Sequence, residues 1–464
     1  MAAYVFAISG ASCNWGRQAT PAQTLPGTDL VGKAQAGCVK FRYDNNGAEL
    51  ARVYPGGVIQ SRHMDASGRI DAISSQLNNA GPLLTSQGYS FNNGGDKTNV
   101  QSWSTGAATS SPGPASGASQ TFTYDSLNRL TKVVETGGSA ASWTYGYDQM
   151  GNRTSLARTG ATGLAAGNET AAYDAASMLT SNSYGAFGYD RNGNETTAPA
   201  GPNGTGIPAR TGQVTDPVGN TTAMTVAGSG LSFGYGGTSP GMYNQLLSAH
   251  GSRYGRSILG LALSSHTTGG TTIRYLIHPN GSNIGYAAPE GQAWFLTDRL
   301  GTIIGLANDT GALIASYSYD PTGLPRATTE TGTLAGYNIH RYAGGILDKT
   351  TGLTRFGVRW YNPATGRFTT PDPSGKEKNK YLYASGNTCA KTDITGEGCG
   401  EDFLFGAISL VGLAASTVGL VASTVAEVPS GGLATAGLWA SVIGYEASWA
   451  GLAGSLYSIK NDCG

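Results

Sequence analysis

Glycine accounts for 71 of the 464 residues of this chain, roughly twice its usual frequency, while charged residues make up only 12%. The 29 basic residues balance the 29 acidic ones, and this zero formal net charge argues against a nucleic-acid-binding protein, which needs a basic surface. The 24 tyrosines and 7 tryptophans argue against disorder, and glycine lacks the Gly-X-Y period of collagen. The composition instead indicates short β-strands joined by tight turns.

The first quarter of the chain predicts β-structure followed by a loop. Residues 1–103 contain the strand–turn–strand patterns FRYDNNGAELARV and RHMDASGRIDAI, which we interpret as degenerate copies of a hairpin repeat. The N-terminus shows neither the basic region nor the apolar run of a clear signal peptide. Residues 104–120 are rich in Ser, Gly, Ala and Pro and predict a low-complexity loop.

Better copies of a Tyr-Asp repeat occupy residues 121–335. Each Asp-x-x-Gly unit fits a type I turn, because aspartate at the first position bonds to the following backbone and glycine suits the fourth. Alternating strands flank the turns, so each unit predicts a hairpin, and a single hairpin is stable only when it pairs with others. The residues to which we assign this turn role include Asp125, Asp148, Gly151, Asp190, Gly193, Asp320 and Gly323.

Residues 336–396 carry an ordered series of short motifs. They are Tyr342-Ala343-Gly344, Asp348 to Leu353, Arg359 to Phe368, Asp372 to Gly375, Tyr381 to Tyr383, Asn387 and Asp393 to Gly396. In this order the motifs resemble the core domain of the rearrangement-hotspot (RHS) family, and the Tyr-Asp units resemble its YD repeats. The resemblance implies a mainly β fold in which a hairpin ribbon curls into a shell capped by the core. We expect a partial shell at this length.

The resemblance also implies an activity. In studied relatives the core is an internal aspartyl protease that cuts the chain just after its final Asp-Pro-x-Gly-Leu motif. Carried over by position, Asp372 and Asp393 are the candidate catalytic carboxylates, with Arg359 nearby and the cut after Glu397. Two acids that share one proton can divide the roles of acid and base.

The alternative is that both aspartates only open turns. Three departures from the family pattern favour it: Ile394 replaces a proline, Glu397 replaces the leucine, and Thr388-Cys389 replaces the usual sequence after Asn387. No other catalytic motif is evident. Asp309-Thr310-Gly311 has the Asp-Thr-Gly sequence of pepsin-type proteases, but we interpret it as a turn. We expect no metal or cofactor, because the five cysteines and five histidines are scattered.

Residues 397–464 predict a variable, hydrophobic C-terminal segment. The 24 residues at 403–426 carry no charge and exceed the ~20 needed to cross a bilayer, and a second apolar stretch follows the break at residues 427–432. Gly, Ala and Ser dominate both stretches, as in close-packed membrane helices, so we expect an α-helical hairpin that is membrane-active or sheltered in the shell. Cys399 and Cys463 bracket it and form a candidate disulfide, the alternative being two unrelated thiols.

These features predict a bacterial, secreted or cell-surface carrier of the polymorphic-toxin type, whose shell encloses or presents the C-terminal segment. Its expected partners are a membrane, an immunity protein or a target-cell surface, and not a nucleic acid. Two alternatives stay open: a surface structural or adhesion protein that binds glycans or proteins, and a truncated remnant of a larger RHS protein.

Overall fold

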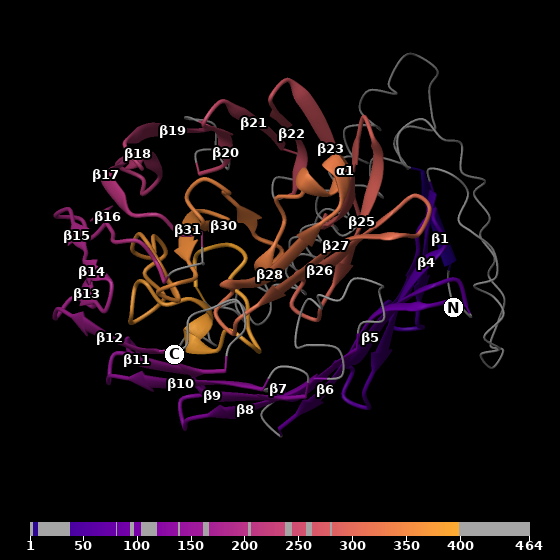
Figure 1. Ribbon diagram of the computed structural model, residues 1–464, viewed down its shortest axis with the longest axis horizontal. Coiled ribbons are helices and arrows are strands. Elements are labelled where there is room, and N and C mark those ends of the chain that lie inside the picture. Colours follow the sequence, from indigo (N-terminus) through magenta and orange to yellow (C-terminus); the bar gives the residue numbers. More distant parts are fainter. Residues whose placement is uncertain are drawn as a thin grey trace, which may run out of the picture.

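A computed structural model shows a chain built mainly of antiparallel strands (Figure 1). The described residues are 3–7, 38–79, 81–92, 97–103, 118–137, 140–160, 167–202, 206–236, 244–256, 262–278 and 281–398. The predicted β-ribbon with a core domain is confirmed by this architecture. The predicted helical tail lies outside the described residues.

The first half of the ribbon is a sheet of 14 strands, each paired with its neighbours in sequence. Its strands are β1 (Ala3–Ala7), β2 (Cys38–Tyr43), β3 (Glu49–Val53), β4 (Val58–Met64), β5 (Ile70–Leu77), β6 (Leu83–Phe91), β7 (Lys97–Trp103), β8 (Ala118–Tyr124), β9 (Leu130–Thr136), β10 (Ala141–Tyr147), β11 (Arg153–Thr159), β12 (Gly167–Tyr173), β13 (Leu179–Asn182) and β14 (Gly185–Ala186). A two-stranded sheet of β15 (Gly188–Tyr189) and β16 (Glu195–Thr197) follows.

The second half of the ribbon is a sheet of 12 strands in the same sequential order. Its strands are β17 (Arg210–Thr215), β18 (Thr221–Val226), β19 (Ser229–Tyr235), β20 (Leu246–Ala249), β21 (Ser252–Arg256), β22 (Leu263–Thr268), β23 (Thr271–Ile277), β24 (Asn283–Ala288), β25 (Gly291–Thr297), β26 (Ile303–Asn308), β27 (Leu313–Tyr319) and β28 (Pro325–Glu330).

The predicted Asp turns join these strands by a common set of hydrogen bonds. In the turn at residues 148–151, the Asp148 carboxylate accepts the Asn152 amide at 2.8 Å, and the Gly151 amide donates to the Asp148 carbonyl at 3.1 Å. Gly151 has a φ of 82°, which a side chain would strain. Equivalent bonds from the amide four residues onward reach the carboxylates of Asp125, Asp190 and Asp320 at 2.9, 2.9 and 2.8 Å. The glycines of the last two turns, Gly193 and Gly323, have φ values of 83° and 90°.

The tyrosine of the repeat joins successive hairpins. Tyr147 donates its hydroxyl to the Leu130 carbonyl at 2.7 Å, and Tyr173 donates to the Arg153 carbonyl at 2.9 Å. Each acceptor lies five residues after the aspartate of the preceding turn. Tyr235 repeats this contact with the Thr221 carbonyl at 2.9 Å. The hydroxyl therefore satisfies a carbonyl at the start of the preceding hairpin's second strand.

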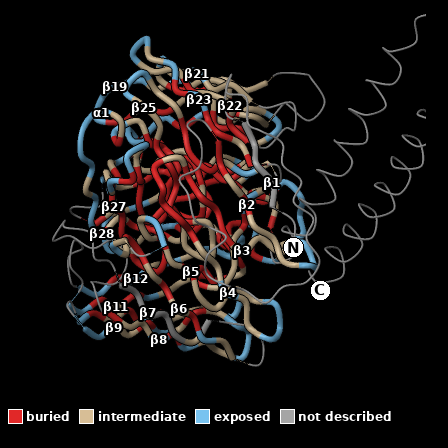
Figure 2. Tube along the Cα trace, turned by 90° about the vertical axis from the view of Figure 1, so that its right-hand side faces the viewer, coloured by how far each residue is buried: buried red, intermediate tan, exposed pale blue. Residues whose placement is uncertain are grey.

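The ribbon curls until its start packs against its later strands. Figure 1 shows it running around the outside from β4 to β23, with β26 to β28 inside. Where the two parts meet, Tyr54 stacks on Trp294 with ring centroids 5.1 Å apart and donates its hydroxyl to the Phe295 carbonyl at 3.2 Å. Buried residues gather in the middle of the molecule (Figure 2).

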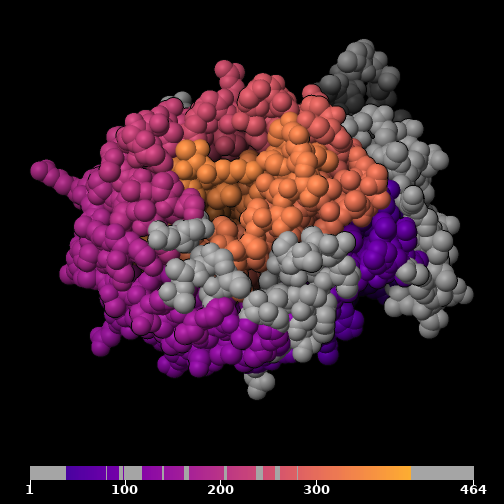
Figure 3. Space-filling view, in the orientation of Figure 1, coloured from indigo at the N-terminus to yellow at the C-terminus, as the bar shows by residue number. Residues whose placement is uncertain are grey.

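The core domain lies within this curl. It contains α1 (Gly332–Gly336), the 3₁₀ turns η1 (Tyr342–Gly344) and η2 (Ala384–Gly386), and a four-stranded sheet of β29 (Ile346–Leu347), β30 (Thr354–Phe356), β31 (Arg359–Asn362) and β32 (Arg367–Phe368). A buried aromatic cluster that includes Phe356, Tyr361 and Tyr383 fixes these short elements together. The space-filling view shows the core inside the ribbon, with a hollow between the core and the ribbon wall (Figure 3).

The core is attached to the aspartate turns of the ribbon. Asn379 donates to the Met150 carbonyl at 3.2 Å, Tyr381 to the Gly193 carbonyl at 2.6 Å, and Tyr361 to the Thr322 carbonyl at 2.7 Å. All three acceptors belong to Asp-x-x-Gly turns. In an antiparallel ribbon these turns lie along one edge, because alternate connections fall on the same side. That edge is where the core docks.

Two sequence predictions need comment at this level. The loop predicted for residues 104–120 ends earlier, because β8 begins at Ala118; strand pairing with β7 and β9 prevails there over the low-complexity composition. Within the described part of the chain, no helix has the length and apolar character to cross a membrane. The hydrophobic stretches predicted to do so lie outside that part.

Candidate self-cleavage site

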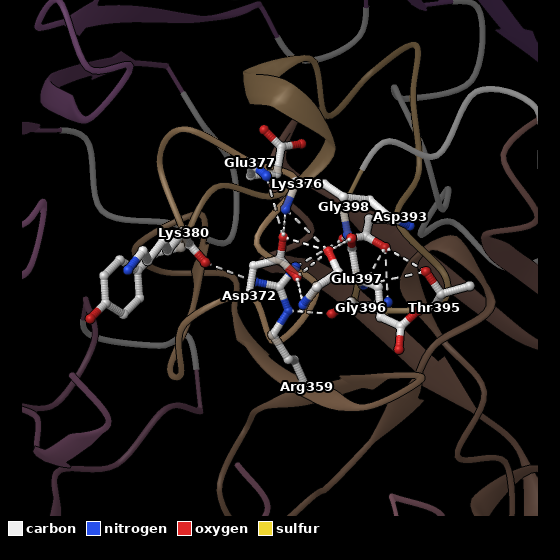
Figure 4. A network of polar contacts seen from close by, with 12 residues as sticks. Arg359, Asp372, Lys376, Glu377, Lys380, Asp393, Thr395, Gly396, Glu397 and Gly398 are labelled. Atoms are coloured by element: carbon white, nitrogen blue, oxygen red, sulfur yellow. Dashed lines mark hydrogen bonds and ion pairs between the residues drawn. The ribbon is translucent and has the colours of Figure 1, made fainter. Parts of the chain in front are cut away.

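The three candidate residues of the predicted protease site lie together in the core domain (Figure 4). Arg359 begins β31, Asp372 follows β32, and Asp393 belongs to the last described loop. Their exposed fractions are 1%, 6% and 0%. Burial of charged groups is unfavourable unless partners compensate, so the contacts of each group define the site.

Arg359 binds both carboxyl-terminal loops of the core. Its guanidinium lies 3.2 Å from the Asp393 carboxylate, donates to the Lys380 carbonyl at 2.9 Å, and donates through Nε to the Gly396 carbonyl. It also lies over the Phe368 ring, 3.6 Å from the centroid. Burial lowers the pKa of Arg359, while Asp393 and Asp372 oppose that shift. Arg359 thus neutralises one carboxylate and fixes the loop that carries it.

The Asp393 carboxylate is enclosed by hydrogen-bond donors of its own loop. Oδ1 accepts the amides of Gly396 at 2.8 Å and Glu397 at 3.2 Å, and Oδ2 accepts the Gly398 amide at 2.9 Å. These bonds wrap residues 393–398 around the carboxylate. The candidate cleavage position therefore touches Asp393 directly through the amide of Gly398.

Asp372 lies on the other side of the same segment. Its carboxylate accepts the Ser374 amide at 2.8 Å and the Lys376 amide at 3.1 Å, and the Ser374 hydroxyl oxygen lies 2.8 Å from it. Ser374 in turn lies 2.8 Å from the carbonyl oxygen of Glu397. Asp372 therefore reaches the Glu397 carbonyl through one serine hydroxyl.

The peptide bond between Glu397 and Gly398 is consequently held at both ends. Its carbonyl contacts Ser374 and thereby Asp372, and its amide nitrogen donates to Asp393. Gly398 has a φ of 76°, and a Cβ there would lie 2.7 Å from Glu377 Cγ and 3.5 Å from Asp372 Oδ2. Only glycine fits at this position without displacing Glu377.

The departures from the family motif fall mostly away from this peptide bond. Ile394 is 38% exposed and its side chain points to the surface. Thr388 donates its hydroxyl to the Pro321 carbonyl at 2.6 Å, and the buried Cys389 thiol lies 3.8 Å from the same carbonyl, so both pack the core against the ribbon. Glu397 contributes only its backbone to the contacts above. The replaced side chains therefore leave the two carboxylates in place.

Sequence reasoning missed two residues of this site. Ser374 occupies the variable position of an Asp-Pro-x-Gly turn, and Gly398 lies beyond the matched motif. The glycine-rich sequence around Glu397 was the one available signal for a tight backbone approach.

The remaining candidate sites are structural or lie elsewhere. No group of three His, Cys, Asp or Glu side chains within the described ranges could hold a metal ion. Cys38 is disulfide-bonded, which the sequence did not predict. Cys399 and Cys463 lie outside the described residues, so their bridge stays a prediction.

Comparison with known families bears on both parts of the fold. The Teneurin YD-shell model matches residues 280–384, and the RHS Repeat model matches residues 124–163. The chain therefore contains repeats of the RHS and YD-shell type. Among curated proteins, tRNA nuclease WapA of Bacillus subtilis (strain 168) is 35% identical over 102 residues, which cover 21% of this chain and 4% of WapA. Salivary gland surface protein 1 of Aedes aegypti is 32% identical over 88 residues, or 19% of this chain and 3% of that protein.

Solved structures share the fold of this chain over a longer stretch. The Photorhabdus luminescens Tc holotoxin pore with a TccC3 mutation aligns with a TM-score of 0.61 at 16% identity, covering 77% of this chain and 19% of that one. TcdB2-TccC3 without its hypervariable C-terminal region aligns with a TM-score of 0.56 at 15% identity and the same coverage. These likenesses show a common shell fold. This chain spans less than a fifth of each of these structures and a few per cent of the curated relatives.

Proposed function

We propose that this protein is an effector carrier that cuts itself after Glu397 and so detaches the segment that follows. The observation that carries the proposal is the Glu397–Gly398 peptide bond, whose carbonyl and amide ends each lie within reach of one buried aspartate. Homology to toxin-related shell proteins supports the carrier role.

The geometry suggests how the two acids divide the work. Asp393 accepts a hydrogen bond from the Gly398 nitrogen, so it is placed to take a proton from an attacking water and return it to that nitrogen as the C–N bond breaks. Asp372 lies on the carbonyl side, where negative charge develops. Arg359 positions Asp393 and the loop but does not contact the peptide carbonyl carbon.

The test is the intact mass of the purified full-length chain. We expect the wild type to yield two fragments, one ending at Glu397 and one beginning at Gly398, and Asp372→Asn to remain whole. Asp216→Asn is the matched control, because Asp216 opens an Asp-Pro-x-Gly turn of the same sequence pattern and its carboxylate accepts the Asn220 amide at 2.9 Å. A single full-length mass for the wild type would refute self-cleavage.

We further propose that the detached segment acts on membranes. The uncharged stretch at residues 403–426 supports this cargo over an enzymatic one, because the tail holds no histidine and, among basic residues, only Lys460. A secreted or surface location is supported by the likeness to the Tc holotoxin pore and to Salivary gland surface protein 1.

Dye-loaded vesicles of anionic phospholipid test the membrane activity. Wild-type protein is expected to release the dye and Asp372→Asn to release much less, because its segment stays attached. Equal release by a cut wild type and the whole variant would show that detachment is not needed. No release by the cut wild type would contradict a membrane-active segment.

A further inference from the structure

Ser374 makes an unusual set of contacts for a turn residue. Its hydroxyl oxygen lies 2.8 Å from each carboxylate oxygen of Asp372 and 2.8 Å from the Glu397 carbonyl oxygen. In three other aspartate turns the third position carries an exposed apolar side chain, at Leu127, Met150 and Val218. The serine therefore links one aspartate of the site to the candidate scissile carbonyl.

Proton counting restricts what these contacts can be. A serine hydroxyl has one proton to donate, whereas a carbonyl oxygen and an ionised carboxylate only accept. If Ser374 donates to the Glu397 carbonyl, its contact with Asp372 is a hydrogen bond only when Asp372 carries a proton and donates it to the serine oxygen. The arrangement is then a directed chain from Asp372 through Ser374 to the carbonyl oxygen.

We propose that Ser374 is a catalytic residue of the self-cleavage, relaying a proton from Asp372 to the carbonyl oxygen of Glu397. The inference rests on the proposed function above. It adds a residue that the family motif leaves unspecified, because the third position of Asp-Pro-x-Gly is variable.

The step balances as follows. A water oxygen bonds to the Glu397 carbonyl carbon while its proton passes to the Asp393 carboxylate. The carbonyl oxygen takes the Ser374 proton, and Ser374 takes the Asp372 proton, which leaves Asp372 ionised. Collapse of the intermediate breaks the C–N bond: the oxygen returns its proton through Ser374 to Asp372, and Asp393 protonates the Gly398 nitrogen. Both aspartates end as they began.

The exposure of Ser374 sets both access and magnitude. Ser374 is exposed, whereas Asp372 and Asp393 are buried, so water reaches the Glu397–Gly398 peptide bond from the side of Ser374. A buried oxyanion donor contributes about 10²–10³-fold to a rate, but an exposed hydroxyl competes with solvent. We therefore expect a loss near the low end, about tenfold to a hundredfold, when the hydroxyl is removed.

A second turn provides a matched control. Thr322 donates to the Asp320 carboxylate at 2.9 Å and lies 3.0 Å from the Pro363 carbonyl, so it makes the same contacts in the turn at residues 320–323. The amide that follows that carbonyl belongs to Ala364 and donates to the Asn362 side chain, not to a carboxylate. Thr322→Val thus removes an equivalent structural bond without touching the Glu397 peptide.

The experiment follows cleavage of the full-length chain during cell-free synthesis, with melting temperatures of the purified products. We expect Ser374→Ala to cut about tenfold to a hundredfold more slowly than wild type, Ser374→Thr to stay within a few-fold, and Thr322→Val to cut at the wild-type rate.

The outcomes separate the two hypotheses. A cut wild type with an equally fast Ser374→Ala, or a Ser374→Thr as slow as Ser374→Ala, overturns the role of Ser374 and leaves self-cleavage standing. If Ser374→Ala is too unstable to purify, the Ser374→Thr rate still decides. An uncut wild type overturns the proposed function and this inference together.

Discussion

The ion pair between Arg326 and Glu135 is expected to hold the two large sheets together. Arg326 lies on β28 and Glu135 on β9, and the two side chains meet through bonds of 2.8 and 3.1 Å. Their exposed fractions are 3% and 0%. Gln120 donates to the same carboxylate at 2.8 Å, and the guanidinium lies 5.1 Å from the centre of the Trp143 ring.

Replacing Arg326 by methionine should destabilise the fold by about 3–5 kcal/mol, the usual cost of leaving one buried charge unpaired. Gln120 alone would remain as a donor to Glu135, and it cannot neutralise the carboxylate. The double variant Arg326→Met/Glu135→Leu should recover most of this loss, because an apolar pair of similar size removes the unpaired charge. The pair therefore specifies how the sheets meet more than it adds net stability.

Thermal unfolding followed by circular dichroism measures both effects. Arg69→Met is the control, since Arg69 pairs with Asp65 at 2.7 Å but is 33% exposed, and such pairs contribute about 0–1 kcal/mol. A melting temperature of Arg326→Met equal to that of Arg69→Met would refute the reasoning. So would a double variant less stable than the single one.

Three further predictions concern the repeats, the buried histidines and the cleavage position. Tyr147→Phe should cost about 1 kcal/mol in thermal unfolding, because the Leu130 carbonyl loses its donor, whereas Tyr337→Phe, whose hydroxyl contacts Glu290 at the surface, should be near neutral. Burial lowers the pKa of His340 to about 4, so below the ordinary histidine pKa of about 6.5 the unfolded chain binds more protons than the folded chain. The free energy of unfolding should therefore fall by up to about 3 kcal/mol as the pH drops from 6.5 to 4. His340→Gln should flatten this pH dependence, and replacement of the exposed His63 by Gln should not. Gly398→Ala should slow self-cleavage more than it lowers the melting temperature, since its Cβ would displace Glu377 beside the peptide bond; unchanged fragment masses at an unchanged rate would contradict this.

The turns of the ribbon could be predicted from sequence because their chemistry is local. The Asp148 carboxylate and the Gly151 backbone act within five residues, so their spacing alone indicates the turn. The role of the repeat tyrosine could not be predicted in this way. Tyr147 reaches Leu130, whose distance in sequence depends on the length of the intervening strands and on their register.

The candidate site divides along the same line. Asp372, Asp393 and Arg359 could be found because they stand in recognisable motifs, and the structure brings them together around residues 396–398. Ser374 could not, because its significance depends on the Glu397 carbonyl 23 residues away. The loop predicted at residues 104–120 is too long for a related reason. Pairing with β7 and β9, and not the composition, decides that β8 begins at Ala118.

The contacts between core and ribbon connect the repeat to the proposed cleavage. The core bonds to backbone carbonyls of the turns, at Met150, Gly193 and Thr322, and not to their variable side chains. The middle residues of a turn can therefore vary, provided that aspartate and glycine keep the carbonyls in place. The same docking fixes β32 and the loop of Asp372, because Tyr381 donates its hydroxyl to the Gly193 carbonyl while its own carbonyl accepts the Phe368 amide at 2.9 Å. Self-cleavage should accordingly require the assembled ribbon, so removing the aspartate of a turn at which the core docks, as in Asp190→Asn, should lower the cleavage rate before it unfolds the chain.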